Sequence, residues 1–137
     1  MKSDLTTKKV VAALISKNNL RDEFLFVMPT KDWAGFNGYY HIPAGHVEKS
    51  ESSEAAMVRE LREELGVEAK ILKKLATTGG DFDDVIVDWF ECSIVPEEDF
   101  TLQEDEIKEA RYFSRNELNT INIWPATKKL FDNHVLK

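Results

Sequence analysis

The chain has little of what disulfide-linked or membrane-spanning proteins need. One of its 137 residues, Cys92, is a cysteine, so no internal disulfide can form. Cys92 lies in an alternating apolar run, which favours a small core side chain over a reactive thiol. No apolar stretch approaches the roughly 20 residues that span a bilayer, and residues 1–4 lead into no signal-like segment. We therefore expect a cytoplasmic protein with no membrane contact.

Positive charge is also scarce. The chain has 18 Lys and Arg against 25 Asp and Glu, a formal net charge of -7. A surface that binds nucleic acid needs a basic stripe to displace counterions from the phosphate backbone. We therefore expect no nucleic acid polymer among the partners. If the ligand is a polyphosphate, a metal ion must mediate the contact between the two anions.

The length of the chain predicts one domain, residues 1–137, with one core. Runs of β-branched and aromatic residues predict strands, and the turn-prone residues 17–19 suggest that the first two strands form a hairpin. The expected strands are 8–16, 23–28, 39–43, 69–78, 85–95 and 110–113. The expected helices are 53–65, 114–119 and 125–134. Strands before, between and after helices predict an α+β or α/β fold with a mixed sheet between helices.

Capping signals bound the helix expected at 53–65. Ser52 can accept a hydrogen bond at its N-terminus, and Glu54 complements the positive end of the helix dipole. Gly66 suits the left-handed residue that closes a helix. The positions predicted to face the core are Ala55, Val58, Leu61 and Leu65.

Three carboxylates on this helix, those of Glu60, Glu63 and Glu64, are spaced to share one face. Three clustered anions repel one another unless a cation neutralises them. Hard oxygen ligands suit Mg²⁺, with Mn²⁺ as a substitute. An acidic helix is otherwise most often a solvated face. Here Gly45 in the preceding loop and Arg59 beside the first glutamate argue against that simpler interpretation.

These residues also form a family pattern. Gly45, Glu51, the run 59–64 and then Gly66 match every fixed position of the Nudix box, so the chain resembles a Nudix hydrolase. Segments 40–44 and 106–113 are similar to the family as well. The resemblance implies an α/β/α sandwich around a central mixed sheet, with a catalytic loop and helix. In length and layout the chain is most similar to the compact, MutT-like nucleoside-triphosphate pyrophosphatases.

The resemblance implies roles for the residues of the box. Glu60, Glu63 and Glu64 would be the main metal ligands, with the carbonyl of Ala44 beside them. Either Glu60 or Glu63 would act as the general base that deprotonates a water molecule. Arg59 lies four residues before Glu63 and is expected to hold it by a charge-assisted hydrogen bond.

Other carboxylates complete the expected site. Glu51 is expected to brace the loop against the helix, and Gly66 has a structural role. A carboxylate remote in sequence often completes such sites in the family. Glu106 lies where we expect it, with Glu104 and Glu109 as alternatives, although ordinary solvated loop charges would look the same.

Fewer signals mark the substrate contacts. Gly45 and His46 are expected to lie against the substrate, although His46 could equally make a loop hydrogen bond. Aromatic residues just before the box could stack on a base or could belong to the core. These aromatic residues are Trp33, Phe36, Tyr39 and Tyr40.

The expected substrate is a (deoxy)nucleoside triphosphate, cleaved to monophosphate and pyrophosphate. Residues 79–87 lack the proline or tyrosine that marks family members acting on ADP-ribose or diadenosine polyphosphates. Thr127 stands near the position of a purine-reading asparagine in relatives specific for oxidised guanine, which argues against that role. A nucleotide-sugar or dinucleoside polyphosphate hydrolase is one alternative, and a non-catalytic nucleotide-sensing module is another. Relatives commonly form homodimers.

Overall fold

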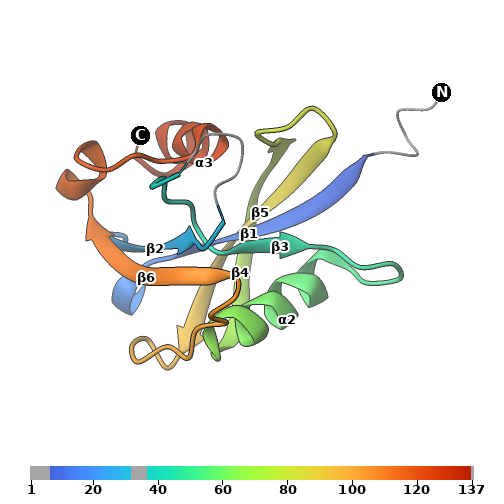
Figure 1. Cartoon of the computed structure of the whole chain (residues 1–137), viewed down its shortest axis with the longest axis horizontal. Helices are drawn as coiled ribbons and strands as arrows, with labels where there is room; N and C mark the ends of the chain where they lie inside the picture. The colour runs from blue at the N-terminus through green and yellow to red at the C-terminus, as the bar shows by residue number, and fades with distance from the viewer. Residues whose placement is uncertain (1–6, 32–36, 137) are drawn as a thin grey trace.

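The computed structural model describes residues 7–31 and 37–136 (Figure 1). None of the helices in this part of the chain is long and apolar enough to cross a membrane. In chain order the elements are β1 (Lys8–Ile15), a 3₁₀ turn (Lys17–Asn19), β2 (Glu23–Pro29), β3 (Ala44–His46), α2 (Ser53–Leu65), β4 (Glu68–Gly79), β5 (Val85–Val95), β6 (Ile107–Ser114), a second 3₁₀ turn (Asn116–Asn119), α3 (Pro125–Leu130) and a π-helical turn (Phe131–Val135).

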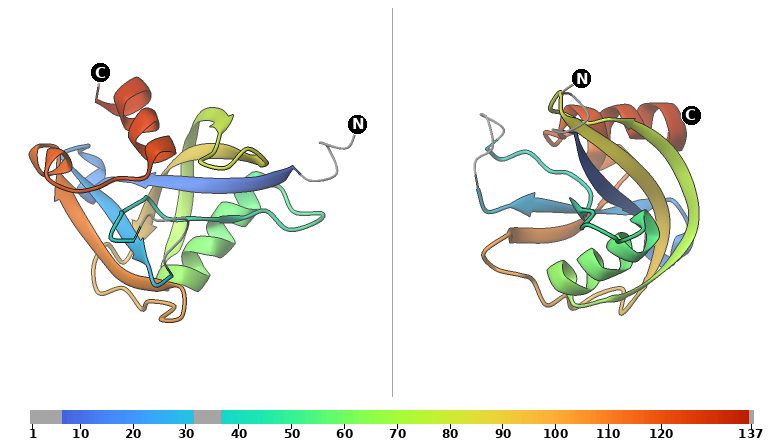
Figure 2. Two further views of the ribbon diagram at one scale, coloured as in Figure 1. Left: turned by 45° about the horizontal axis from the view of Figure 1, so that its top comes forward. Right: turned by 90° about the vertical axis from the view of Figure 1, so that its right-hand side faces the viewer.

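The main sheet is mixed, as predicted. Its strand order is β3-β1-β5-β4, with β1 parallel to β5 and the other neighbours antiparallel. A second, two-stranded antiparallel sheet joins β2 to β6. Figures 1 and 2 show α2 and α3 on opposite sides of the central strands, so the sheet lies between helical layers.

Strand β1 is buried on both faces and joins the two halves of the core. Val11 and Ala13 pack in the cluster that contains α2, while Ala12 and Leu14 pack in the cluster that contains α3. A fully buried Val or Leu side chain stabilises the fold by about 1.5–3 kcal/mol relative to an exposed one. This strand therefore fixes the position of the helix that carries the glutamates.

The predicted hairpin between the first two strands is wrong. β1 and β2 share only the isolated bridge from Ser16 to Phe24, and β2 pairs instead with β6. Both edges of β1 are already occupied by β3 and β5. Asn18, Asn19 and Arg21 have left-handed φ angles of 56°, 58° and 59°, which turn the chain out of the main sheet.

Other boundaries differ from the prediction by smaller amounts. The strand expected at 39–43 is reduced to isolated bridges of Tyr40 and His41, and the regular strand β3 begins after it. The helix expected at 114–119 is a 3₁₀ turn, and the C-terminal helix passes into a π-helical turn. In contrast, α2 and β5 have the predicted bounds.

The buried side of α2 is rotated relative to the prediction. Leu61 and Leu65 are buried as expected, but Ala55 is exposed and Val58 only half-buried. The remaining buried positions of this helix are Ala56, Met57 and Glu64. The rotation places a carboxylate, Glu64, on the side of the helix that faces the protein interior.

A buried aspartate anchors the start of α2 to the sheet. Asp88 on β5 accepts hydrogen bonds from Ser53 Oγ and Thr77 Oγ1, both at 2.6 Å. The ammonium groups of Lys9 and Lys74 each lie 3.2 Å from its carboxylate. Burial raises the pKa of Asp88, but these four donors outweigh it and hold the pKa well below its ordinary value. Asp88 therefore ties α2 to three strands.

Candidate active site

Gly45 allows the loop before α2 to pass directly against the helix. A Cβ atom placed on Gly45 would overlap the side chain of Glu60. Gly45 is held in β3 by pairing with Val11 on β1, so the loop cannot easily retreat. Close approach to Glu60, and not an unusual backbone angle, is what requires glycine at this position.

Arg59 connects this loop to the glutamate helix. Its Nε and Nη2 atoms donate to the two carboxylate oxygens of Glu51 at 2.7 and 3.0 Å. Nη2 also donates to the carbonyl of His46 at 3.0 Å. Nη1 donates to Glu60 at 3.2 Å and to Glu63 at 3.1 Å. One guanidinium group therefore braces the loop and orients two glutamates.

Glu51 and Gly66 mark the two ends of this assembly. Hydrogen bonds from Arg59, and then from the backbone N–H of Glu48, lower the pKa of Glu51 to about 2. Its carboxylate therefore stays ionised beside the guanidinium group. Gly66 has the left-handed φ of 69° expected at the end of the helix, and its N–H donates to the carbonyl of Arg62.

Glu64 is the most deeply buried carboxylate of the helix. Its exposed fraction is 5%, and its Oε1 atom has no hydrogen-bond partner among the described residues. Burial, together with the neighbouring charges of Glu60 and Glu106, raises the pKa of Glu64 to about 9. Burial also raises the pKa of Glu60. Without a cation, the carboxyl group of Glu64 therefore holds a proton that an exposed glutamate would lose.

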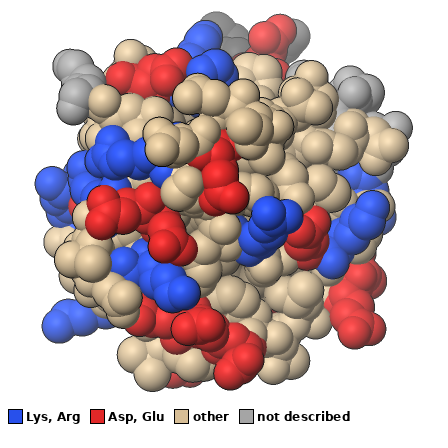
Figure 3. Space-filling model, turned by 90° about the vertical axis from the view of Figure 1, so that its left-hand side faces the viewer, with Lys and Arg blue, Asp and Glu red and all other residues tan. Residues whose placement is uncertain are grey.

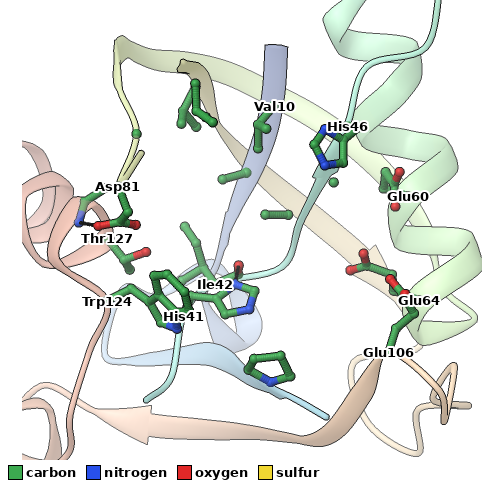
Figure 4. A pocket seen from close by; sticks show the side chains of 18 of the residues that line it. Val10, His41, Ile42, His46, Glu60, Glu64, Asp81, Glu106, Trp124 and Thr127 are labelled. Carbon is green, nitrogen blue, oxygen red and sulfur yellow. Dashed lines mark hydrogen bonds between the residues drawn. The ribbon is translucent and has the colours of Figure 1, made fainter. Parts of the chain in front are cut away.

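Backbone hydrogen bonds bring a remote carboxylate to the same place. The N–H groups of Thr101 and Gln103 donate to the carbonyls of Leu65 and Glu64 at 3.0 and 2.9 Å. The segment before β6 is thereby attached to the last turn of α2. Glu106 follows in this segment, and Figure 4 shows it beside Glu64.

The structure distinguishes among the three candidates for this remote carboxylate. Among them, Glu106 lines the cavity next to Glu60 and Glu64, whereas Glu104 and Glu109 do not. Glu109 instead accepts a hydrogen bond from the hydroxyl of a tyrosine at 3.0 Å.

That tyrosine is Tyr40, which was expected to contact the substrate. It lies outside the residues that line the cavity, because its ring packs edge-on against Phe113 with 4.9 Å between ring centroids. Its contribution to the cavity comes from its backbone. The carbonyl of Tyr40 accepts a hydrogen bond from the N–H of Trp124 at 3.0 Å and so holds that residue in place.

The predicted convergence of the three helix glutamates is only partly seen. Glu63 is half-exposed, with 51% of its side chain accessible, and it is absent from the cavity lining. Because Glu64 faces the interior, the neighbouring Glu63 points about 100° away around the helix. Its carboxylate pairs with Arg59 instead. The structure therefore brings together Glu60, Glu64 and Glu106.

These carboxylates lie at one end of a cavity of about 350 Å³. Ala44, which was expected to be a metal ligand, and Gly45 and His46, which were expected to contact the substrate, all line this cavity. In Figure 4 the acidic group lies across the cavity from a second group that comes from the β4–β5 loop and the start of α3. Trp33 and Phe36 lie outside the described residues. The lining at the far end is Asp81, Phe82, Trp124, Ala126 and Thr127.

Aromatic rings form part of this far end. The ring centroid of Trp124 lies 6.1 Å from that of His41 and 6.2 Å from that of Phe82. His41 Nδ1 lies 2.8 Å from the carbonyl of Ile42, which can only accept, and burial lowers the pKa of His41, so the ring is neutral at pH 7. These residues carry no spacing motif, so the sequence did not indicate that they would meet.

The acidic end fits a hard divalent cation. Its donors are carboxylate oxygens, and the orphaned Oε1 atom of Glu64 is the kind of buried group that a cation would satisfy. Within residues 7–31 and 37–136, no three His, Cys, Asp or Glu side chains already stand in a metal-binding arrangement. Arg59 holds Glu60 from the other side, so metal binding would involve side-chain rotation.

A carboxylate-lined cavity that fits a divalent cation defines a candidate metal-dependent enzyme. A model of the NUDIX domain matches residues 6–134, and the chain belongs to the Nudix hydrolase family, whose members act on phosphoric anhydrides. It is 31% identical over 105 residues to an uncharacterized Nudix hydrolase of Listeria monocytogenes, covering 75% of this chain and 62% of the relative. It is 40% identical over 81 residues to the NAD-capped RNA hydrolase NudC of Pseudomonas aeruginosa, covering 59% of this chain and 29% of that protein.

The chain therefore spans less than two thirds of the length of these curated relatives. Solved structures show the same fold. The MutT NUDIX hydrolase from Burkholderia pseudomallei superposes with a TM-score of 0.77 at 17% identity, covering 92% of this chain and 96% of that one. The NUDIX domain of Shewanella oneidensis NrtR, complexed with ADP ribose, superposes with a TM-score of 0.74 at 16% identity, covering 92% and 84%.

The close approach at Gly45 leads to a first prediction. Gly45→Ala should displace Glu60 and lower kcat for nucleotide hydrolysis by about 10²-fold, since a displacement near 1 Å costs roughly this much. Gly79→Ala is the matched control, because a Cβ there meets no atom within 4 Å. Steady-state kinetics and thermal melts of both variants provide the measurement. Wild-type turnover in a folded Gly45→Ala variant would contradict the prediction.

The raised pKa of Glu64 leads to a second prediction. The folded chain holds this proton up to about pH 9, whereas the unfolded chain releases it near 4.5, so rising pH between these values destabilises the cation-free protein. Glu64→Gln removes that titration. At about pH 8 the free energy of unfolding of the variant should exceed that of the wild type by about 1–3 kcal/mol. This difference in stability should disappear near pH 5.

Denaturant unfolding in chelator at the two pH values measures this gap. Glu63→Gln is the control, because it makes the same substitution at the neighbouring, half-exposed glutamate, which does not line the cavity. Mg²⁺ should then stabilise the wild type and leave Glu64→Gln unchanged. A stability gap that does not vary with pH would argue against the buried, protonated carboxyl.

Proposed function

We propose that the chain is a Mg²⁺-dependent pyrophosphohydrolase that cleaves a nucleoside diphosphate linked to a further group. Within this class, we propose that it converts a (deoxy)nucleoside triphosphate into a monophosphate and pyrophosphate. One observation carries the proposal: a single cavity holds carboxylates at one end and aromatic rings at the other (Figure 4). Phosphates and a base need those two environments.

The size of the cavity supports a substrate with one nucleoside. A volume of about 350 Å³ lies near the lower end of the roughly 300–1,000 Å³ typical of ligand pockets. One base with its sugar and the reacting phosphates fits such a space better than two nucleosides do. This favours a triphosphate over a dinucleoside polyphosphate.

The ligands for Mg²⁺, or Mn²⁺ as a substitute, would be Glu60, Glu64 and Glu106, with the carbonyl of Ala44 beside them. The bound cation would offset the charge of the substrate phosphates and lower the pKa of a water molecule. Glu63 could join these ligands only by leaving Arg59. The role of Arg59 is to position the loop and Glu60.

Glu60 is better placed than Glu63 to act as general base. It lines the cavity, whereas Glu63 lies on the solvent side of the helix. Glu60 would take a proton from the water that attacks one phosphorus of the anhydride. The bond from that phosphorus to the bridging oxygen would break, and the other product, pyrophosphate or the nucleoside monophosphate, would leave with that oxygen on the opposite side.

Two alternatives have some support. Sequence identity to relatives named NAD-capped RNA hydrolases favours cleavage of a dinucleotide. On the face that Figure 3 shows, however, basic and acidic side chains are intermixed and do not form a basic surface for RNA. The likeness to a NUDIX domain that was solved with ADP ribose raises the alternative of a nucleotide-sensing module. A sensor does not require the complete set of catalytic glutamates, whereas this chain has the complete set.

Product analysis tests the proposed reaction. With Mg²⁺, a nucleoside triphosphate should yield monophosphate and pyrophosphate, and a nucleotide sugar or NAD should react more slowly. Chelator should abolish the activity, and added Mg²⁺ or Mn²⁺ should restore it. Glu60→Gln should lower kcat by about 10²–10⁴-fold, while Glu104→Gln, outside the cavity, should not. Hydrolysis that persists in excess chelator would refute metal dependence, and no hydrolysis of any nucleotide would refute the enzyme.

A further inference from the structure

Tyr40 and Glu109 are joined by a hydrogen bond that crosses a whole strand. The hydroxyl of Tyr40 donates to Oε1 of Glu109 at 3.0 Å, although 69 residues separate the two in sequence. Strand β2 runs between them, because Val27 bridges His41 on one side and pairs with Ala110 on the other. Neighbouring strands lie about 4.8 Å apart, so the bond joins backbones about 10 Å from each other. It therefore clamps three neighbouring segments together.

The chemistry of this bond makes it a strong one. Burial, and then the hydrogen bond to Glu109, raises the pKa of Tyr40, so the hydroxyl keeps its proton and remains a donor. The acceptor is a carboxylate, and hydrogen bonds to charged groups stabilise more than those between neutral groups. The second carboxylate oxygen of Glu109 lies 3.9 Å from Nη1 of Arg111, which leaves Oε1 for Tyr40. The bond therefore holds the ring of Tyr40 in one place.

The backbone of Tyr40 carries this constraint to Trp124. Its N–H donates to the carbonyl of Asn122 at 2.8 Å, and its carbonyl accepts from the N–H of Trp124 at 3.0 Å. Residues 40–41 form isolated bridges and no regular strand, so their position depends on a few single bonds. Trp124 in turn lines the far end of the cavity and precedes α3 directly. The side-chain bond of Tyr40 therefore helps to place that end.

Glu109 also belongs to the framework of the acidic end. Strand β6 begins directly after Glu106 and carries Glu109. The N–H of Thr30 donates to the carbonyl of Glu106 at 3.1 Å, which joins β2 to the start of β6. Figure 4 shows Glu106 and Trp124 on opposite sides of the cavity. The same strand therefore holds Glu106 at its start and supports Trp124 through Tyr40.

We propose that Glu109 is a positioning residue: through Tyr40 it fixes Trp124 at a set distance from the carboxylates, so that one substrate reaches both ends. Without the bond, the segment with Trp124 can move away from β6, and a substrate held by its phosphates loses contacts at its other end. That loss weakens substrate and transition state alike, so it raises KM and leaves kcat nearly unchanged. This inference rests on the proposed function, because it concerns the same cavity.

Two variants break the bond from its two sides. Tyr40→Phe removes the donor and keeps the ring, and Glu109→Ala removes the acceptor. Each should raise KM about 10-fold, the effect of losing one hydrogen bond to a charged group, while kcat changes by less than about twofold. The substrate for this comparison is whichever of ATP, GTP, CTP, UTP and their deoxy forms the wild type hydrolyses fastest.

The double variant and a conservative variant test whether the bond itself is responsible. Tyr40→Phe combined with Glu109→Ala should raise KM no further than either change alone, because both remove the same link. Glu109→Gln should keep KM near the wild-type value, because its amide oxygen can accept the same hydrogen bond.

Tyr112→Phe is the matched control. Tyr112 lies on the same strand, its hydroxyl donates to the carbonyl of Glu97 at 2.9 Å, and it does not line the cavity. This variant loses a tyrosine hydrogen bond that does not lead to Trp124. Its melting temperature should fall, and its KM should equal that of the wild type. A rise in KM as large as that of Tyr40→Phe would show that general destabilisation explains the effect, and would overturn the proposal.

The position of Trp124 can also be followed without turnover. The chain has three tryptophans, and incorporation of 5-fluorotryptophan gives each a ¹⁹F resonance. The resonance of Trp124 is the one that disappears in Trp124→Phe. It should shift or broaden in Tyr40→Phe and Glu109→Ala, and it should stay in place in Tyr112→Phe.

The outcomes separate this proposal from the proposed reaction. An unchanged KM in both single variants would overturn the role of Glu109 and leave the reaction standing. If no nucleotide is hydrolysed, the reaction is overturned and the ¹⁹F resonance decides: a shift supports the link from Glu109 to Trp124, and an unmoved resonance overturns it. Should Glu109→Ala fail to fold, Tyr40→Phe, which keeps the ring, decides alone.

Discussion

The structure depends on enclosing two neighbouring carboxyl groups, those of Glu60 and Glu64, in a small space. Glu60 lies across Gly45, and Glu64 is buried beneath the same helix with one oxygen that lacks a partner among the described residues. Arg59 offsets part of this charge from the solvent side. The fold therefore tolerates an unfavourable cluster, which is typical of a site kept for binding or chemistry.

The framework around this cluster explains how the fold supports it. Asp88 fixes the start of α2 to three strands, and backbone hydrogen bonds join its last turn to the segment that carries Glu106. The helix is thus held at both ends. On the far side of the sheet, α3 and the β4–β5 loop meet through Asp81 and close the other end of the cavity.

The sequence predicted the local parts of this arrangement better than the contacts between distant parts. The bounds of α2 followed from Ser52, Gly66 and the helical period, which act over a few residues. The inward rotation of Glu64 depends on how the helix packs on the sheet, so the predicted apolar stripe was shifted. The hairpin failed because pairing of β2 with β6 is decided across about 80 residues of chain. The far end of the cavity, with Asp81 and Trp124, carried no motif and was missed.

The central claim is that this cavity gathers Glu60, Glu64 and Glu106 around one divalent cation. Titration with Mn²⁺, followed by calorimetry or electron paramagnetic resonance, tests it directly when Glu106→Gln is compared with Glu104→Gln. We expect Glu106→Gln to weaken binding by about 10–100-fold and Glu104→Gln to bind as the wild type does. Equal affinity in both variants, or no binding by the wild type, would contradict the account.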